Sequence, residues 1–237
     1  MIAESGSQLP LPISLDEGAT FENFHAAGNQ AAVDALKKLA QSGGQRALFL
    51  WGGDGRGKSH LLQAACRLAT HSGRRAIYLP MSQAVLLDPQ AADNLDSYQL
   101  VCVDDVQRVA GIEPWQKALL VLFDALAQKG GGFVATARTA PGAIKRLLPD
   151  LASRLAWGPV FQLEPLSDED KILALKQRAS RRGFELPDDT AQFLLKRQQR
   201  DMRSLCATLD ALDTASLVAQ RRLTLPFVKA FLDKRQP

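Results

Sequence analysis

The sequence predicts an α/β fold, in which a five-stranded parallel sheet flanked by helices is followed by a small all-helical domain. Three observations lead to this prediction. Short apolar runs alternate with amphipathic segments, a glycine-rich turn joins the first run to a helix, and only helical periodicity continues after about residue 165. Short apolar strands separated by helices are typical of a parallel sheet covered on both faces.

The composition is that of an ordinary globular protein. Of 237 residues, 46% are hydrophobic and 23% are charged, and no apolar run approaches the length of a membrane span. The first residues lack the basic and apolar blocks of a secretory signal. Cys66, Cys102 and Cys206 lie far apart in apolar contexts, as small core residues of a reducing compartment do. We therefore expect a cytoplasmic protein with no membrane partner.

The predicted elements of the first domain follow in order from residue 21 to 164. An amphipathic helix is expected at 29–40. The five expected strands are 47–51, 76–79, 100–104, 132–136 and 160–163. Helical spacing of apolar residues predicts a helix at 59–71, and another is expected at 114–128, where Pro114 occupies an early position that tolerates proline.

The second domain is expected at 165–237. It begins with Ser167, Asp168, Glu169 and Asp170, which have the character of a capping box. Helices are predicted at about 168–182, 188–197, 201–219 and 226–234, with Gly183, Pro187 and Pro226 at or beside the breaks between them.

Residues 1–20 form a separate segment without helical periodicity. Pro10 and Pro12 favour an extended conformation, which directs Leu9, Leu11 and Ile13 to one side. This apolar side either packs on its own domain or fills a pocket on another protein, as short linear motifs do.

The glycine-rich turn carries the most specific chemistry in the chain. Residues 52–59 match the phosphate-binding pattern G-x-x-x-x-G-K-[ST] without a mismatch. Its position between a strand and a helix suits anion binding, because backbone N–H groups and the helix dipole converge on a phosphate there. We expect Lys58 to reach the β- and γ-phosphates and the Ser59 hydroxyl to hold Mg²⁺. The alternative is a glycine-rich surface turn.

Two carboxylates end the third expected strand. In phosphate-binding-loop folds, a strand beside the loop supplies an acid that orders Mg²⁺. Asp104 is the candidate for this role, in part through water, and Asp105 is the candidate for orienting the attacking water. The alternative for Asp105 is that it caps a turn.

The net charge of +4 comes from the second domain. Residues 1–150 carry 14 basic and 14 acidic side chains, whereas residues 151–237 carry 15 and 11. This excess of basic side chains either faces nucleic acid or an acidic partner, or belongs to solvated helix faces.

These residues resemble a family. The loop and the strand ending in Asp104 and Asp105 are similar to those of AAA+ ATPases of the bacterial replication-initiator (DnaA) branch. Residues 149–155 resemble that branch's arginine-finger box, and 202–205 resemble its sensor-2 helix. Residues 163–171, 182–187 and 8–13 look like the Hda family, the DnaA-homologous regulatory inactivators of initiation.

The resemblance implies site residues and partners. Arg154 would act as an arginine finger in trans on ATP bound to DnaA. ADP or ATP with Mg²⁺ would be bound by Arg203 and by the loop region, which comprises Gly52, Gly53, Asp54, Gly55, Arg56, Gly57, Lys58, Ser59 and His60. ADP is expected to favour the active form. Arg138 stands near a position that is acidic in the initiator branch, so self-catalysed hydrolysis is expected to be weak.

The resemblance also implies a second partner. In the Hda family the N-terminal segment binds the sliding clamp, the beta subunit of DNA polymerase III. Gln8 would be the polar anchor, with Leu9, Leu11 and Ile13 near the apolar pocket. DNA would then be contacted indirectly through the clamp. Self-association into a dimer or larger oligomer is also possible, since AAA+ domains pair an arginine finger with a neighbour's nucleotide.

Two other functions compete with a negative regulator of replication initiation. One is an autonomous AAA+ ATPase that remodels DNA or loads a helicase, which the basic residue at 138 disfavours. The other is a placement factor that tethers proteins to DNA through its own basic lid, which the modest charge and the expected lack of a duplex-binding module disfavour.

Overall fold

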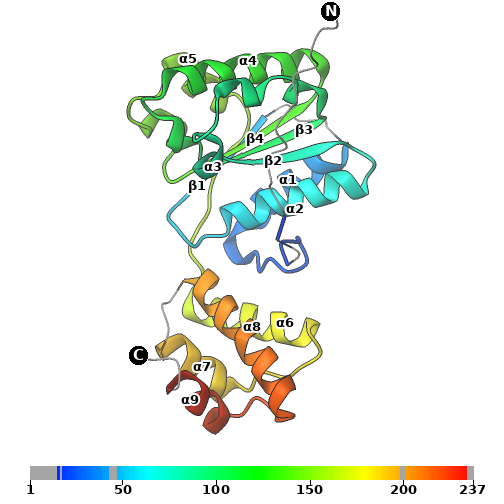
Figure 1. Ribbon diagram of the computed structural model, residues 1–237, viewed down its shortest axis with the longest axis vertical. Coiled ribbons are helices and arrows are strands. Elements are labelled where there is room, and N and C mark those ends of the chain that lie inside the picture. The colour runs from blue at the N-terminus through cyan, green and yellow to red at the C-terminus, as the bar shows by residue number, and fades with distance from the viewer. Residues whose placement is uncertain (1–14, 17, 43–46, 198–200, 234–237) are drawn as a thin grey trace, which may run out of the picture. The chain divides into compact units, whose positions relative to one another are not determined.

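The structure is a computed structural model that describes residues 15–16, 18–42, 47–197 and 201–233 (Figure 1). It contains two compact units. Unit 1 comprises Met1–Phe21, Asn29–Gly53 and Lys58–Leu163, and unit 2 comprises Glu22–Gly28, Asp54–Gly57 and Glu164–Pro237. Two short segments of the N-terminal half thus group with the C-terminal helices.

Unit 1 is built on a five-stranded sheet in which every pairing is parallel. The spatial order is β2-β3-β4-β1-β5. The strands are β1 (Ala47–Trp51), β2 (Ala76–Pro80), β3 (Leu100–Asp104), β4 (Gly132–Ala137) and β5 (Val160–Gln162). This arrangement confirms the predicted fold class. Because β1 lies between β4 and β5, the glycine-rich turn that follows it starts from an inner strand of the sheet.

Helices cover both faces of the sheet. They are α1 (Gln30–Ser42), α2 (Lys58–His71), α3 (Met81–Ala84), α4 (Glu113–Lys129) and α5 (Pro149–Leu155). Figure 1 shows α1 and α2 on one face and α4 and α5 on the other. On the α4 side the core is aromatic, with the rings of Phe123 and Phe133 5.2 Å apart and Trp115 buried.

Two helices of unit 1 were not among the predicted elements. Helix α3 has only 4 residues and α5 has 7. Neither provides two full turns, and helical periodicity cannot be recognised in so short a segment. Helix α5 begins at Pro149, a position where the missing N–H of proline costs nothing. It buries Leu151 and Leu155, and Arg154 lies beside them with its side chain partly exposed.

The C-terminal part of unit 2 is an all-helical lid, as predicted. Its helices are α6 (Asp168–Arg181), α7 (Asp188–Arg197), α8 (Met202–Ala219) and α9 (Leu225–Asp233). Ser167 caps α6, since its Oγ accepts a hydrogen bond from the Asp170 N–H at 3.0 Å. Leucines dominate the lid core, including Leu175, Leu194 and Leu209.

Among the described residues, no helix is both long enough and apolar enough to cross a bilayer.

Candidate functional site

The glycine-rich turn has a backbone that only glycine adopts easily. Gly55 and Gly57 have φ angles of +74° and +82°, in the left-handed region. A Cβ atom on Gly57 would also lie 2.5 Å from Cε2 of Phe24. Gly57 is therefore required both by its own backbone and by its neighbour, and these two requirements fix the shape of the turn before α2 begins.

Lys58 is the first residue of α2 and is only 6% exposed. Its Nζ donates hydrogen bonds to the carbonyl oxygens of Gly52 at 2.7 Å and Gly53 at 2.8 Å. A buried ammonium beside the N-terminal N–H groups of a 14-residue helix is suited to an anion. The arrangement fits the phosphates of a nucleotide, as the pattern predicted.

Asp104, at the end of β3, is buried and held by two hydroxyl groups. Tyr78 Oη donates to Oδ2 of Asp104 at 2.6 Å, and Thr136 Oγ1 donates to Oδ1. Both donors are neutral hydroxyls, and no ion pair with Asp104 is found among the described residues. A buried carboxylate held in this way is suited to a cation or to the water bound to one.

Asp105 differs from Asp104 in its backbone conformation and in the partner of its side chain. Its φ of +57° is left-handed, and its backbone N–H donates to Thr136 Oγ1 at 3.0 Å. Its side chain accepts a hydrogen bond from Gln107 Nε2 at 3.0 Å. Asp105 precedes the 3₁₀ turn Val106–Val109, but its side chain makes no capping hydrogen bond there. The capping alternative is therefore absent from this structure, and the water-orienting role remains a prediction.

The sheet register brings these groups to one edge. Pro80 of β2 is paired with Asp104, and Leu50 of β1 is paired with Thr136. The Gly52 N–H donates to the Ala137 carbonyl at 3.2 Å, which ties the start of the turn to the end of β4. The carboxyl ends of β1, β2, β3 and β4 therefore present the turn, Tyr78, Asp104 and Thr136 together.

Tyr78 holds one of the groups predicted to face Mg²⁺, since its hydroxyl donates to Asp104 at 2.6 Å. Burial raises the pKa of Tyr78 far above its ordinary value, and the nearby Asp104 charge adds to the effect, so the phenol stays protonated. Sequence reasoning identified neither Tyr78 nor Thr136 as a site residue. The available signal was the position of a polar residue near the carboxyl end of an apolar strand.

The oxygen groups at this edge fit a magnesium nucleotide. Ser59 offers a hydroxyl, Asp104 offers a carboxylate, and Mg²⁺ prefers a few such oxygen ligands with the substrate phosphates and water supplying the rest. Among the described residues, no cluster of three or more His, Cys, Asp and Glu side chains is available to hold a metal alone. A metal at this edge would therefore depend on a bound nucleotide.

The remaining predicted nucleotide residues are more dispersed. His60, in the first turn of α2, has its Nε2 2.7 Å from the Thr20 carbonyl oxygen. Asp54 and Arg56 belong to the turn segment that groups with unit 2. Arg203 is exposed in the first turn of α8, and Arg138 is exposed just after β4.

Arg154 lies on α5 and contacts two side chains. Its Nε is 2.8 Å from Oδ1 of Asp124 on α4, and its guanidinium carbon lies 5.9 Å from the ring centre of Trp157. The Arg154 side chain is 42% exposed. Arg154 thus forms an ion pair within unit 1, which among the described residues engages one of its three guanidinium nitrogens.

The predicted clamp-binding residues Gln8, Leu9, Leu11 and Ile13 lie outside the described residues.

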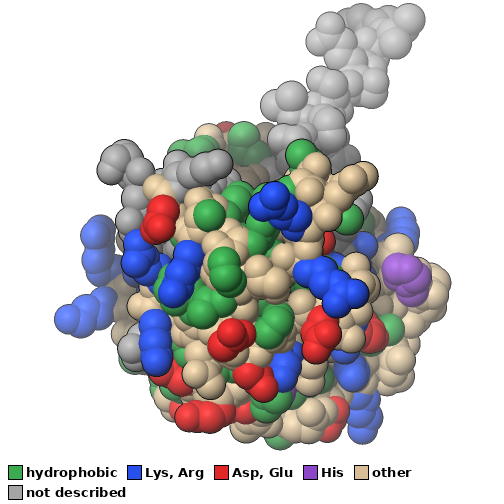
Figure 2. Space-filling view, turned by 90° about the horizontal axis from the view of Figure 1, so that it is seen from below, with side chains coloured by type: hydrophobic (Ala, Val, Ile, Leu, Met, Phe, Trp, Pro, Cys, Tyr) green, Lys and Arg blue, Asp and Glu red, His purple; other side chains and the backbone are tan. Residues whose placement is uncertain are grey.

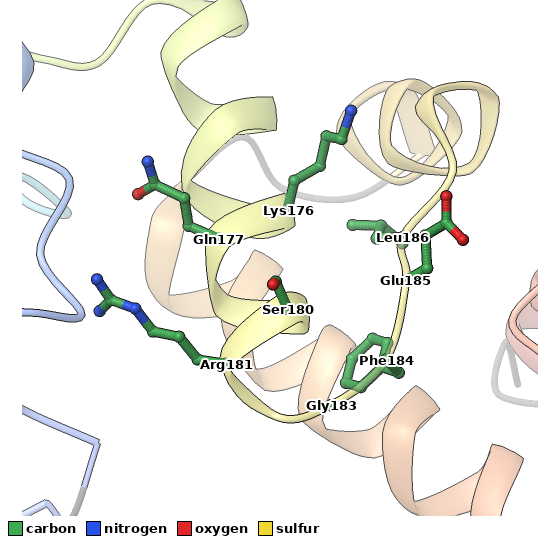
Figure 3. A pocket seen from close by; sticks show the side chains of 8 residues that line it. All are labelled: Lys176, Gln177, Ser180, Arg181, Gly183, Phe184, Glu185 and Leu186. Carbon is green, nitrogen blue, oxygen red and sulfur yellow. The ribbon is translucent and has the colours of Figure 1, made fainter.

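The lid has a hollow of its own. It measures about 660 Å³ and lies along α6 and the turn that follows, with Lys176, Arg181, Phe184 and Glu185 among its lining residues (Figure 3). Mixed charges and an open shape give it no set of convergent groups comparable to those beside Lys58 and Asp104. The phosphate-loop edge of unit 1 is the stronger candidate site.

Comparison with known proteins places this geometry in a family. Residues 15–162 match the profile described as the bacterial DnaA ATPase domain. Residues 168–232 match the profile described as the lid domain of Hda. The two matches together span most of both units.

Solved structures share the fold. Domain III of the replication initiation protein DnaA from Thermotoga maritima superposes with a TM-score of 0.79 at 24% identity, covering 94% of this chain and 98% of that one. AMPPCP-bound DnaA from Aquifex aeolicus gives 0.70 at 22% identity, with 85% and 67% coverage. The Thermotoga maritima RuvB branch-migration motor gives 0.63 at 18% identity, with 86% and 68% coverage.

Proposed function

The chain belongs to the family of bacterial DnaA ATPase domains and has a lid of the Hda type, and we propose that it is a negative regulator of chromosomal replication initiation. Its activity is to stimulate hydrolysis of the ATP bound to the initiator DnaA. Arg154 supplies a guanidinium group to the initiator's nucleotide. The product is ADP-bound initiator, which cannot open the origin again.

The setting of Arg154 is the observation that carries the proposal. Asp124 engages Nε alone, and among the described residues no hydrogen-bond partner is found for Nη1 or Nη2. These two nitrogens form the fork that binds two phosphate oxygens at once. Helix α5 lies on the face of the sheet opposite α2, the helix that the phosphate loop begins (Figure 1). A nucleotide on another molecule is therefore the natural target of Arg154.

The surface around Arg154 suits a protein partner. Trp157 and Val121 are large apolar side chains that are 59% and 69% exposed. Trp157 lies against both Arg154 and Phe123, whose ring centre is 5.8 Å away. Exposed tryptophan and arginine together are typical of interface residues that contribute most of the binding energy.

The protein's own nucleotide has a regulatory role in this proposal. Lys58 binds the phosphates, and Ser59 and Asp104 hold Mg²⁺, with ADP favouring the active form. Hydrolysis of ATP bound to this protein itself is weak. The exposed Arg138 stands after β4 where the initiator branch has an acid, and it cannot accept a proton or orient water as a carboxylate does.

The clamp brings the protein to replicated DNA. Residues 8–13 bind the beta sliding clamp, with Gln8 as the polar anchor and Leu9, Leu11 and Ile13 in the apolar pocket. Such a contact depends little on salt. Direct DNA binding would instead weaken steeply as salt is raised, because each phosphate contact releases counterions.

The decisive experiment follows radiolabelled ATP pre-bound to DnaA. Clamp loaded on DNA is added with ADP, with and without this protein. We expect fast conversion to ADP that requires both the clamp and this protein. Arg154→Ala should lower the stimulated rate by about three orders of magnitude, the lower end of the range for an arginine finger, while nucleotide and clamp binding persist.

The matched control is Arg222→Ala, which removes the same charge from an exposed position of unit 2. Equal stimulation by the Arg154→Ala protein would rule out the assigned role. Absence of stimulation, together with hydrolysis of ATP bound to this protein itself, would favour an autonomous remodeller or helicase loader instead.

A further inference from the structure

The hydroxyl group of Tyr78 holds one of the protein groups that would face Mg²⁺. It donates to Oδ2 of Asp104 at 2.6 Å. Tyr78 is 8% exposed and Asp104 is 5% exposed, so water does not compete freely for this bond.

The direction of this hydrogen bond follows from the number of protons. A phenol has one proton, and Tyr78 gives it to Asp104, because a carboxylate can only accept. The bond therefore fixes one lone pair of Oδ2 and leaves the others free to point elsewhere.

A carboxylate that faces a metal-bound water needs this orientation, since its oxygens must accept from that water in a fixed rotamer. Thr136 fixes Oδ1 and Tyr78 fixes Oδ2, while each oxygen retains a further lone pair.

We propose that Tyr78 is a positioning residue for magnesium, which orients the Asp104 carboxylate toward the Mg²⁺ of a bound nucleotide. The proposal deepens the proposed function in that it rests on binding of a magnesium nucleotide at the phosphate loop. It does not depend on the action of Arg154 on the initiator.

The test compares ADP binding with and without Mg²⁺ in the full-length protein. ADP affinity is measured by calorimetry in EDTA and then along a Mg²⁺ titration. Tyr78→Phe removes only the hydroxyl oxygen. We expect ADP affinity in EDTA to change less than about twofold, while the Mg²⁺ midpoint rises about five- to tenfold, the value of one hydrogen bond.

The chain offers a matched control. It has two tyrosines, and Tyr98 also packs partly buried against the core of unit 1. Tyr98→Phe should leave both ADP affinity and the Mg²⁺ midpoint unchanged. An equal loss of ADP affinity in EDTA and in Mg²⁺ for Tyr78→Phe would indicate a merely structural role and overturn the proposal, as would an unchanged Mg²⁺ midpoint.

A second measurement keeps the hydroxyl and so remains valid if Tyr78→Phe does not fold. The otherwise unaltered protein is labelled with 3-fluorotyrosine, and the Tyr98→Phe protein assigns the two ¹⁹F resonances. Adding Mg²⁺ to the ADP complex should shift the Tyr78 resonance and leave that of Tyr98 in place. No shift at Tyr78 overturns the proposal. If the unaltered protein binds no ADP in the calorimetry, with or without Mg²⁺, the nucleotide part of the proposed function fails as well. That outcome is distinct from a failure of the Tyr78 proposal, in which the unaltered protein still binds the magnesium nucleotide.

Discussion

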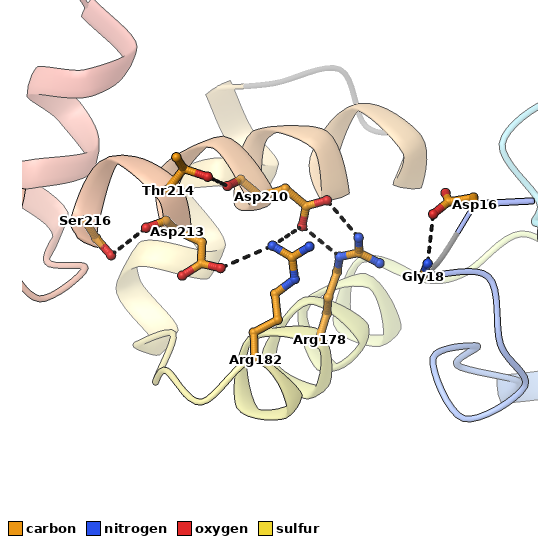
Figure 4. Close-up of polar contacts among 8 residues, drawn as sticks. All are labelled: Asp16, Gly18, Arg178, Arg182, Asp210, Asp213, Thr214 and Ser216. Carbon is orange, nitrogen blue, oxygen red and sulfur yellow. Dashed lines mark hydrogen bonds and ion pairs between the residues drawn. The ribbon is translucent and has the colours of Figure 1, made fainter. Parts of the chain in front are cut away.

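Two aspartates, Asp104 in unit 1 and Asp210 in the lid, are held in opposite ways. In unit 1, Asp104 is buried and bonded to neutral hydroxyls of Tyr78 and Thr136. In the lid, Asp210 lies near the surface and is bound by cations. Arg178 contacts both of its carboxylate oxygens, at 3.0 Å and 2.8 Å, and Arg182 lies 3.2 Å from one of them (Figure 4).

The difference separates an aspartate available for chemistry from one used for structure. Neutral donors fix the geometry of a carboxylate without forming an ion pair with it. Such a carboxylate can still interact with a cation that is bound together with a ligand. Arginine partners cancel the charge, so Asp210 and Asp213 join α8 to α6 and offer nothing to a ligand. The presence of acidic residues alone does not distinguish the two cases.

The same contrast bears on the basic excess of residues 151–237. Arg178, Arg182 and Arg197 pair with lid aspartates, so part of the positive charge is balanced locally. On the face shown in Figure 2, basic and acidic side chains are interspersed with apolar ones. This distribution favours solvated helix faces over a nucleic-acid surface for the lid.

Removing a hydroxyl from unit 1 should have the largest effect on stability. Thr136→Val keeps the shape of the side chain but deprives Asp104 Oδ1 of a donor and the Asp105 N–H of its acceptor. Because both groups are held by this one oxygen, we expect a loss of about 2–4 kcal/mol in the free energy of unfolding. Trp51, Trp115 and Trp157 all lie in unit 1, so urea unfolding followed by tryptophan fluorescence reports on it.

Thr136→Ser is the control for this prediction. Serine retains the hydroxyl and should recover most of the loss, apart from the methyl group. If Thr136→Val unfolds at the same urea concentration as the parent protein, Asp104 finds other donors and the contrast between the units is weaker than the structure indicates.

An intermediate effect is expected at the N-terminus of α8. Asp201 caps this helix by accepting a hydrogen bond from the Ser204 N–H at 3.0 Å, and that bond, ahead of the other causes, lowers the pKa of Asp201. Asp201→Ala should cost about 1 kcal/mol at pH 7. Hydrogen exchange of the α8 amides measures this locally, since the lid contains no tryptophan.

The pH dependence has a definite sign. Because the pKa of Asp201 is lower in the folded state, its contribution is complete above the pKa of the unfolded chain, about 3.9, and declines as pH falls through the folded value. Asp201→Ser caps without titrating. The exchange difference between Asp201→Ser and the parent protein should therefore move in favour of serine between about pH 4 and pH 2, and a pH-independent difference would contradict the assignment.

The parts of this comparison that the sequence could predict are the local ones. The bounds of β1 and β3 agree with the prediction because each is a continuous apolar run between polar residues. The Ser167 cap could also be predicted from local sequence, since its donor and acceptor are three residues apart. Lys58 and Asp104 could be identified because their motifs are contiguous.

The partners of Asp104 could not be predicted because they depend on register. Tyr78 and Thr136 lie 26 and 32 positions away in sequence, on different strands. Only the pairing of β2, β3 and β4 brings them to one carboxylate, and periodicity within one strand carries no information on that pairing. Asp124, the partner of Arg154, was missed for the same reason, since it comes from a different helix.

A smaller effect is expected for the bidentate pair of the lid. Arg178→Lys keeps the charge but loses the fork that contacts both oxygens of Asp210. Since Arg178 is 19% exposed and Asp210 is 33% exposed, the pair is only partly screened. We expect a loss of about 0.5–1 kcal/mol, measured as faster exchange of the α6 and α8 amides. A loss as large as that of Thr136→Val would mean that the lid pair is as critical as the buried network.

The smallest effect should come from an exposed ion pair of the lid. Lys176 Nζ lies 2.7 Å from Oδ1 of Asp188, with side chains that are 40% and 71% exposed. Water and salt screen such a pair, so Lys176→Ala should change stability by less than about 0.5 kcal/mol, and the change should vanish in about 1 M salt. The Thr136→Val loss should persist at the same salt concentration, because no mobile ion can replace a hydroxyl inside the sheet edge. Salt therefore separates the two kinds of aspartate. If the stability losses of Lys176→Ala and Thr136→Val both disappeared in high salt, Asp104 would be as accessible to solvent ions as Asp188. The buried hydroxyls would then not be what keeps Asp104 available to a nucleotide-bound cation.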